Sequence, residues 1–269
     1  MVSDRFERFR PPPHLQALVA EIDLQESSRS VNQGVLPELG LVLGFQYRGT
    51  LSTFDATGNE RTLDKHGVTG LQEQTRSFRS SGSLGSILVR LRPWAGRQFL
   101  GLPADEVTGL SLGLDLFLPE RDLEPFIGDL TQASTDKARL ALVATFLDRA
   151  LAGVAIDPLT QRAVSLIDQR RGLVRVSDLV KELGTSHSPL NRRFQDQVGI
   201  GPKAYGSLVR LRQLLPLLSS FEGNLTDLAV QMGFHDQAHF IHEFHRLTGL
   251  SPRQYQNRDR WTESLVHLE

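Results

Sequence analysis

The first half of the chain carries short runs of apolar residues broken by polar residues and glycines. Strand-like density of β-branched, aromatic and apolar residues occurs in residues 19–24, 35–53, 66–71, 75–79 and 84–91. Glycines interrupt the second run at Gly40, Gly44 and Gly49, and glycine inside a strand pattern indicates a bend or a bulge. We therefore expect a small β-barrel or β-sandwich built from paired, bent strands.

Helical periodicity follows these strands. The pattern predicts short helices over residues 94–100 and 120–130 and a longer helix over residues 136–152, which carries a wide apolar stripe opposite charged residues. Such a stripe usually packs into a core, and a subunit interface is the alternative. Residues 153–158 read as a linker, and residues 159–171 as the first helix of a second domain.

The C-terminal part contains one pattern twice. Asp178-Leu179 and Gly184 recur 49 residues later, and the four landmarks that follow them recur 50 residues later. Those four landmarks are Phe194, Gly199, Pro202 and Tyr205, which correspond to Phe244, Gly249, Pro252 and Tyr255. A repeat of this regularity indicates one structural unit present in two copies.

Each copy reads as a helix, a tight glycine-containing turn and a second helix. We expect Ser177 to cap the first helix of copy one, and Asn224 or Thr226 that of copy two. Second helices are predicted from about Ser186 to Gln197 and, behind Asp236, to Leu247. This arrangement is the helix-turn-helix unit, whose second helix enters the DNA major groove, although an α-helical repeat without a ligand has the same pattern.

A long helix predicted from Lys203 to Ser219 joins the two copies. It would hold two recognition helices at a set separation, suited to major grooves ~34 Å apart on one face of a duplex. Pro216 lies near its end, where proline removes a hydrogen bond, so we expect a kink there.

Residues 159–260 resemble the DNA-binding domain of the AraC/XylS family of transcriptional regulators. The stretch that carries the resemblance is Gly233-Phe234-His235-Asp236-Gln237-Ala238-His239-Phe240, followed by Phe244, Gly249, Ser251-Pro252 and Tyr255. The segment Leu36-Pro37-Glu38-Leu39-Gly40 and residues 88–103 resemble members with a poorly characterised N-terminal domain. The resemblance implies an α+β protein, with a β-rich regulatory domain and an all-α domain of two helix-turn-helix units.

The resemblance also implies which residues meet DNA. The first recognition helix would present Ser188, Asn191 and Arg192, and the second would present Gln237, Ala238, His239 and His242. Two residues depart from the usual pattern: Pro189, in a first turn where proline is tolerated, and His242, where arginine is common. Double-stranded DNA is thus the expected partner, with RNA polymerase, a small-molecule effector and a second copy of the chain as further candidates.

Length and charge agree with two domains of different roles. The 269 residues divide into a β-rich domain (1–152), the linker (153–158), the DNA-binding domain (159–260) and a tail (261–269). Residues 1–158 hold 16 basic and 20 acidic residues, a net charge of −4, whereas residues 159–260 hold 14 and 9, a net of +5. The positive excess lies in the half expected to contact phosphates.

Composition narrows the location and the chemistry. The chain has no cysteine, which excludes disulfides and thiolate metal sites, and we see neither a signal peptide nor a membrane-length apolar run. We expect a cytoplasmic protein without a membrane partner and without a cofactor. In the β-rich domain, the effector-contacting residues we expect are Tyr47, Arg90, Arg92 and Trp94, because Arg90 and Arg92 would share one strand face and could pair with an anion.

Enzyme chemistry is the competing hypothesis. Gly109-Leu110-Ser111-Leu112-Gly113 matches the nucleophile elbow of esterases, but the residues after it do not read as a helix, and no histidine stands between Ser111 and the repeats. The β-rich domain has only His14 and His66, too few for an imidazole-rich metal site. His235, His239, His242 and His245 could gather zinc, on a helix face expected to meet DNA. A β-barrel enzyme that processes small molecules remains the alternative function.

Overall fold

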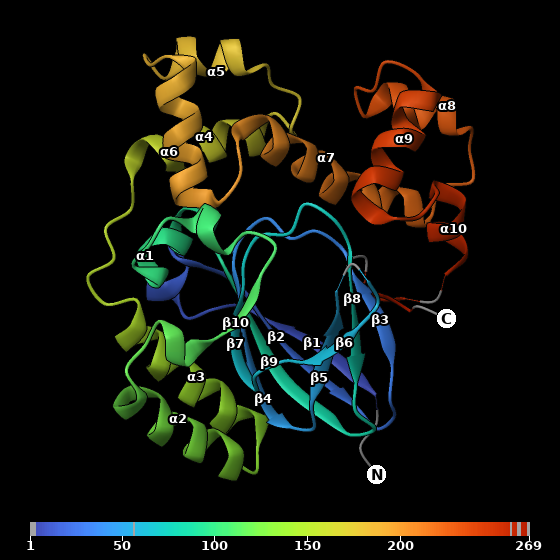
Figure 1. Ribbon diagram of the computed structural model, residues 1–269. Coiled ribbons are helices and arrows are strands. Elements are labelled where there is room, and N and C mark those ends of the chain that lie inside the picture. The colour runs from blue at the N-terminus through green and yellow to red at the C-terminus, as the bar shows by residue number, and fades with distance from the viewer. Residues whose placement is uncertain (1–3, 56, 259, 263–264, 268–269) are drawn as a thin grey trace.

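The computed structural model describes residues 4–55, 57–258, 260–262 and 265–267. Two six-stranded antiparallel sheets face each other in the N-terminal half (Figure 1). The first sheet contains β1 (Arg5–Phe9), β2 (Val19–Ser27), β9 (Leu84–Leu91), β4 (Val42–Arg48), β7 (His66–Thr69) and β10 (Ser111–Gly113). The second contains β11 (Arg260–Thr262), β12 (Leu265–His267), β3 (Asn32–Val35), β8 (Arg76–Ser80), β5 (Leu51–Phe54) and β6 (Glu60–Thr62). The described strands therefore form a sandwich and not a closed barrel.

Ten α-helices lie in the described residues. Those of the N-terminal half are α1 (Gly96–Leu100), α2 (Glu120–Gln132) and α3 (Asp136–Ala150). The C-terminal group is α4 (Pro158–Gln169), α5 (Val176–Glu182), α6 (His187–Val198), α7 (Pro202–Ser219), α8 (Leu225–Gln231), α9 (Gln237–Thr248) and α10 (Pro252–Asn257). Short 3-10 helices are η1 (Pro13–Leu15), η2 (Pro93–Ala95), η3 (Ala104–Val107) and η4 (Leu114–Leu116). No described helix combines the length and the apolar composition needed to cross a bilayer.

The outer face of the first sheet packs against α2 and α3. Phe45 of β4 meets Phe126 and Phe146 edge-on, at centroid distances of 5.2 and 5.3 Å, and the latter two rings stack at 4.4 Å. Val143 and Leu147 of α3 are fully buried in the same cluster. The apolar stripe of α3 thus packs as core, which is the first of the two interpretations that its sequence allows.

Some helix ends differ from the sequence prediction. Ser177 lies inside α5, whose N-cap residue is Arg175, because the helix begins at Val176. In the second copy the cap is Asn224, whose side chain accepts a hydrogen bond from Thr226 N at 2.9 Å. Asp236 caps α9 as predicted, and accepts from His239 N at 2.7 Å. The connecting helix α7 ends at Ser219 as predicted and contains Pro216 on its exposed face.

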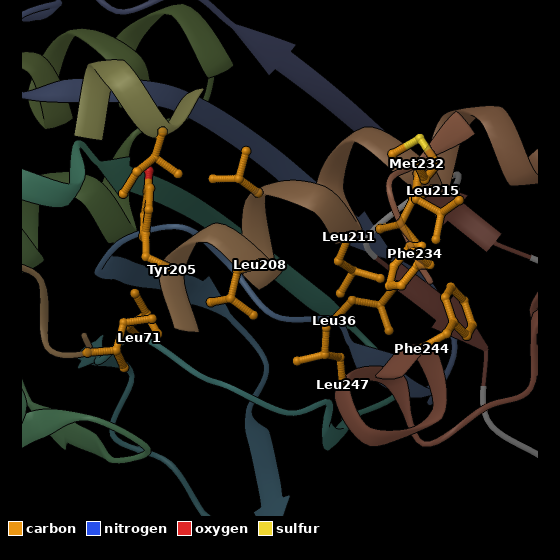
Figure 2. Close-up of a cluster of buried hydrophobic side chains, with 14 of the residues drawn as sticks. Leu36, Leu71, Tyr205, Leu208, Leu211, Leu215, Met232, Phe234, Phe244 and Leu247 are labelled. Atoms are coloured by element: carbon orange, nitrogen blue, oxygen red, sulfur yellow. The ribbon is translucent and has the colours of Figure 1, made fainter. Parts of the chain in front are cut away.

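The two halves of the chain share one apolar core. Leu36 and Leu71, from loops of the β-sandwich, are 1% and 2% exposed and belong to one buried cluster with the helical half, where Leu36 lies near Leu211 and Leu247 and Leu71 lies near Tyr205 (Figure 2). Polar contacts add to this core at the end of α6: Arg97 Nη1 donates to Asp196 Oδ1 at 2.7 Å, and Thr108 Oγ1 donates to Gly199 O at 2.9 Å. The sandwich therefore supports the helical half directly.

The last described strands return to the sandwich. Residues 265–267 form β12 and pair antiparallel with β3, so that Leu265 lies opposite Val35 and Val266 opposite Gly34. Val266 is fully buried. The predicted tail is thus part of the second sheet where it is described, while residues 263–264 and 268–269 lie outside the described residues.

His66 predicts a pH dependence of stability. Its half-buried ring lies 6.4 Å from the Phe45 ring, and burial, with a smaller contribution from the Lys65 charge, lowers the pKa of His66 to about 4. Since the unfolded pKa is near 6.5, stability present above about pH 6.5 should be lost as pH falls towards 4, by up to about 1.4 kcal/mol per pH unit. Urea unfolding at several pH values measures the free energy of unfolding, which should change less with pH in His66→Leu than in the wild type. An equal pH dependence of the two proteins would contradict the assignment.

Candidate functional site

Two helix-turn-helix units stand on either side of α7. The first consists of α5 and α6 and the second of α8 and α9. In each, a glycine with positive φ makes the turn between the helices, Gly184 at 62° and Gly233 at 72°. Another glycine, Gly199 or Gly249, ends the second helix in the left-handed region. The repeated glycines of the sequence therefore have one local cause, since only glycine adopts this conformation without strain.

All three predicted DNA contacts of α6 are exposed, and two of them have no side-chain partner on the helix. Leu190 and Phe194 are fully buried, which turns Ser188 and Arg192 towards solvent. Among the residues that the structure describes, none forms a hydrogen bond or an ion pair with Arg192. Asn191 is exposed as well, but its amide donates to Gln195 Oε1 at 3.0 Å. Arg192 is therefore the cation on this helix that is most available to DNA.

On α9 the predicted contacts are more constrained. Phe240 and Phe244 are buried, and Ala238, His239 and His242 are exposed. Thr226 Oγ1 donates to Gln237 Oε1 at 2.8 Å, which leaves the amide nitrogen as the free end of Gln237. His239 Nδ1 accepts from His235 N at 3.4 Å, and its ring meets Phe234 edge-on at 5.6 Å. The α9 face thus presents side chains that are held in place before any partner binds.

The connecting helix sets the separation of these two faces. α7 has 18 residues, which at 1.5 Å per residue gives a length of about 27 Å, close to the ~34 Å between successive major grooves. Its inward residues are buried in both units, from Tyr205 at one end to Leu218 at the other. The two recognition helices are therefore mounted on a single element, on opposite ends of one continuous core.

The four histidines near α9 do not gather. His235 pairs with the neighbouring Asp236 at 3.0 Å, and His239 is engaged in the turn as described. The described residues contain no group of three or more His, Cys, Asp or Glu side chains arranged for a metal ion.

A cavity of about 110 Å³, partly open to solvent, lies between the two sheets. Apolar side chains such as Leu51, Val68, Phe78 and Leu88 line it together with charged and amide side chains. Gln46, 6% exposed, has an amide oxygen with no partner among the described residues. The cavity thus combines an apolar wall with polar groups that can orient a ligand, as small-molecule sites do.

Of the four effector-contacting residues predicted from the sequence, only Arg90 lines this cavity. β9 ends at Leu91, so Arg92 no longer follows the strand alternation and donates instead to Gln16 O at 3.2 Å. Tyr47 points to the opposite face of the first sheet, where its hydroxyl donates to Glu26 Oε1 at 2.9 Å. Trp94 is buried against the helical half, and its Nε1 donates to Ala17 O at 2.9 Å.

Arg76 is a cavity residue that sequence reasoning missed. Its guanidinium donates to Ser111 Oγ at 3.0 Å and to Thr53 Oγ1 at 3.1 Å. Within the described part of the chain, no carboxylate forms an ion pair with it, and burial together with the nearby Arg61 charge lowers its pKa. Arg76 and Phe78 lie two positions apart on β8 and therefore share one face of the strand, a spacing from which their common position could have been predicted.

Ser111 has hydroxyl neighbours instead of an imidazole. Its Oγ lies 3.0 Å from Thr69 Oγ1 and accepts from Arg76, and none of the described histidines is hydrogen-bonded to it. The three-residue strand β10 is followed by the 3-10 helix η4, whereas a nucleophile elbow requires an α-helix directly after the serine.

Each half of the chain matches a known family model. Residues 179–258 match the family model "Helix-turn-helix domain", and residues 7–112 match "Domain of unknown function (DUF6597)". The chain is 31% identical over 90 residues to the HTH-type transcriptional regulator MtrA of Neisseria gonorrhoeae, covering 34% of this chain and 30% of MtrA. It is 39% identical over 71 residues to the HTH-type transcriptional activator RhaS of Shigella boydii, covering 26% of each protein. The matches thus span less than a third of these relatives.

Among solved structures, ToxT from Vibrio cholerae covers 93% of this chain and 97% of its own, with a TM-score of 0.48 and 11% sequence identity. The C-terminal domain of AraT from Geobacillus stearothermophilus covers 37% of this chain and 84% of its own, with a TM-score of 0.35 and 24% identity. Residues 179–258 thus form a helix-turn-helix domain that is similar to those of transcriptional regulators of the AraC/XylS type.

Proposed function

We propose that this chain is a sequence-specific DNA-binding regulator of transcription, which reads adjacent major grooves with α6 and α9. The observation that carries the proposal is the mounting of two exposed recognition faces on the single helix α7. The net charge of +5 over residues 159–260 supports contact with phosphates. Contact with RNA polymerase, pairing with a second copy of the chain, a cytoplasmic location and the domain boundaries given above belong to the same proposal.

The cavity between the sheets is the proposed effector site. A small molecule would bury its apolar body against Leu51, Phe78 and Leu88 and would meet the unpaired amide oxygen of Gln46. Arg76 supplies a cation without a carboxylate partner in the described part of the chain, which suits an anionic group on that molecule. Buried polar groups without partners are costly, so a ligand that satisfies them gains affinity.

The first test is selection of genomic fragments with the purified full-length protein, followed by footprinting of the recovered sequence. We expect two protected major-groove segments about one helical turn apart, with affinity that falls as salt rises from about 50 to 200 mM. A single protected segment, or binding that ignores salt, would contradict the two-helix assignment.

Arg192→Ala should weaken binding to that sequence by about 1–3 kcal/mol, because it removes a base or phosphate contact that no intramolecular partner competes for. Fluorescence anisotropy with the selected duplex measures the loss. Arg121→Ala is the control, since this exposed arginine on α2 removes the same charge from the N-terminal half. Equal effects of the two variants would mean that only net charge matters, and would remove Arg192 from the site.

A further inference from the structure

Glu38 connects the cavity to the helix that carries both recognition units. The side chain is 7% exposed and lines the cavity. Its Oε1 lies 3.0 Å from Arg90 Nε, without the angle of a hydrogen bond, and its Oε2 accepts from Arg212 Nη1 of α7 at 3.2 Å. Arg90 also pairs with the fully buried Asp23. A chain of charges therefore runs from the cavity wall to the middle of α7.

The segment around Glu38 is held at both ends. Residues 36–40 follow β3, and Leu36 is buried near Leu211 of α7 and Leu247 of α9 (Figure 2). At the other end Gly40 lies so close to β9 that a Cβ on it would stand 2.5 Å from Leu91 O. β3 itself pairs with β12, which belongs to the end of the chain. Residues 36–40, named the coupling loop below, thus touch the cavity and the connecting helix, and they directly follow the strand that pairs with β12.

The sandwich also grips both units separately. The first unit is held through Asp196, which accepts from Arg97 at 2.7 Å. The second is held through Leu247, whose carbonyl oxygen accepts from Thr75 N at 3.0 Å. The sandwich makes both of these contacts. The placement of the recognition helices therefore depends on how the sandwich packs against α7.

We propose that the coupling loop transmits occupation of the cavity to α7, and that Glu38 is the residue that passes the signal. This inference rests on the proposed effector site. A ligand that fills the cavity contacts the wall formed by Arg90 and Glu38 and competes with Arg90 for the carboxylate. Displacement of Glu38 changes its pairing with Arg212 and shifts Leu36 against α7 and α9. The ligand thereby alters how the sandwich holds the helix that carries both recognition units.

Amide hydrogen exchange of the full-length protein tests this coupling without requiring DNA or an identified ligand. Glu38→Gln should raise exchange about tenfold, or about 1.4 kcal/mol of local opening, in residues 36–40 and also in residues 208–215 of α7. The control Glu60→Gln removes the exposed pair with Arg79, 2.6 Å apart at the far edge of the second sheet, and should leave α7 unchanged. A coupling loop that loosens while α7 keeps its protection would overturn the proposal.

Arg212→Met tests the same contact from the side of α7. Position 212 should tolerate substitution better than position 38, because Arg212 is partly exposed. It should raise exchange in the coupling loop and at the end of β9; protection unchanged at both places would refute the coupling. Ser86→Met places a larger side chain in the cavity from β9 and should change amide exchange in α7. When Glu38→Gln is already present, adding Ser86→Met should cause no further change in α7. Since no readout here involves DNA, failure of the coupling can be told apart from failure of DNA recognition.

Discussion

Replacement of Arg90 by methionine should lower the free energy of unfolding by about 3–5 kcal/mol. Arg90 is the cation that Asp23 and Glu38 share in the interior of the sandwich, and Asp23 has no exposed surface. Without Arg90 the two carboxylates stay buried, and among the described residues only Arg8 and Arg212 still form ion pairs with them, at 3.1 and 3.2 Å. Burial of charges with incomplete pairing is costly because their hydration is lost.

Urea denaturation followed by tryptophan fluorescence measures this loss. Arg79→Met is the control: its pair with Glu60 is exposed, so its removal should change stability by less than about 1 kcal/mol. The double variant Arg90→Met with Asp23→Leu should recover part of the loss, because one orphaned carboxylate is removed as well. If Arg90→Met and Arg79→Met cost the same, the ion cluster does not stabilise the sandwich as we infer.

Phe244→Ala should cost about 3–5 kcal/mol and should act mainly on the second helix-turn-helix unit. The ring is 1% exposed and meets the rings of Phe240 and Tyr255 edge-on at 6.0 and 5.8 Å. Its removal leaves a cavity beneath α9 and weakens the packing of α9 against α7. Footprinting should then show loss of one of the two protected segments, while the segment read by α6 keeps its protection.

Phe194→Ala is the matched variant, since Phe194 has the corresponding place in the first unit and is also fully buried. There the end of α6 is additionally clamped to the sandwich through Arg97 and Thr108, so its recognition face should tolerate the cavity better. If folded Phe244→Ala protected neither DNA segment, the two units would not pack and bind independently, which would contradict this prediction.

Local features of the fold could be predicted from the sequence because their causes are local. The glycines that end or separate helices, the capping by Asp236 and the periodic burial of Leu190, Phe194, Phe240 and Phe244 all follow from residues a few positions apart. Prediction failed at the ends of elements. The strand of residues 84–91 has its predicted bounds, so Arg92 lies beyond it and does not share a strand face with Arg90. Ser177 does not cap its helix, because α5 begins at Val176.

The sequence by itself determined the two helix-turn-helix units, the helix that joins them, the β-rich character of the other half and the charge difference between the halves. Only the tertiary structure decided which strand faces enclose the cavity, that β12 completes the second sheet, and that Glu38 meets Arg212 across 174 positions of sequence. The physical reason is that alternation along a strand defines two faces without saying which is inside. That choice, like the pairing of distant charges, depends on how the layers pack.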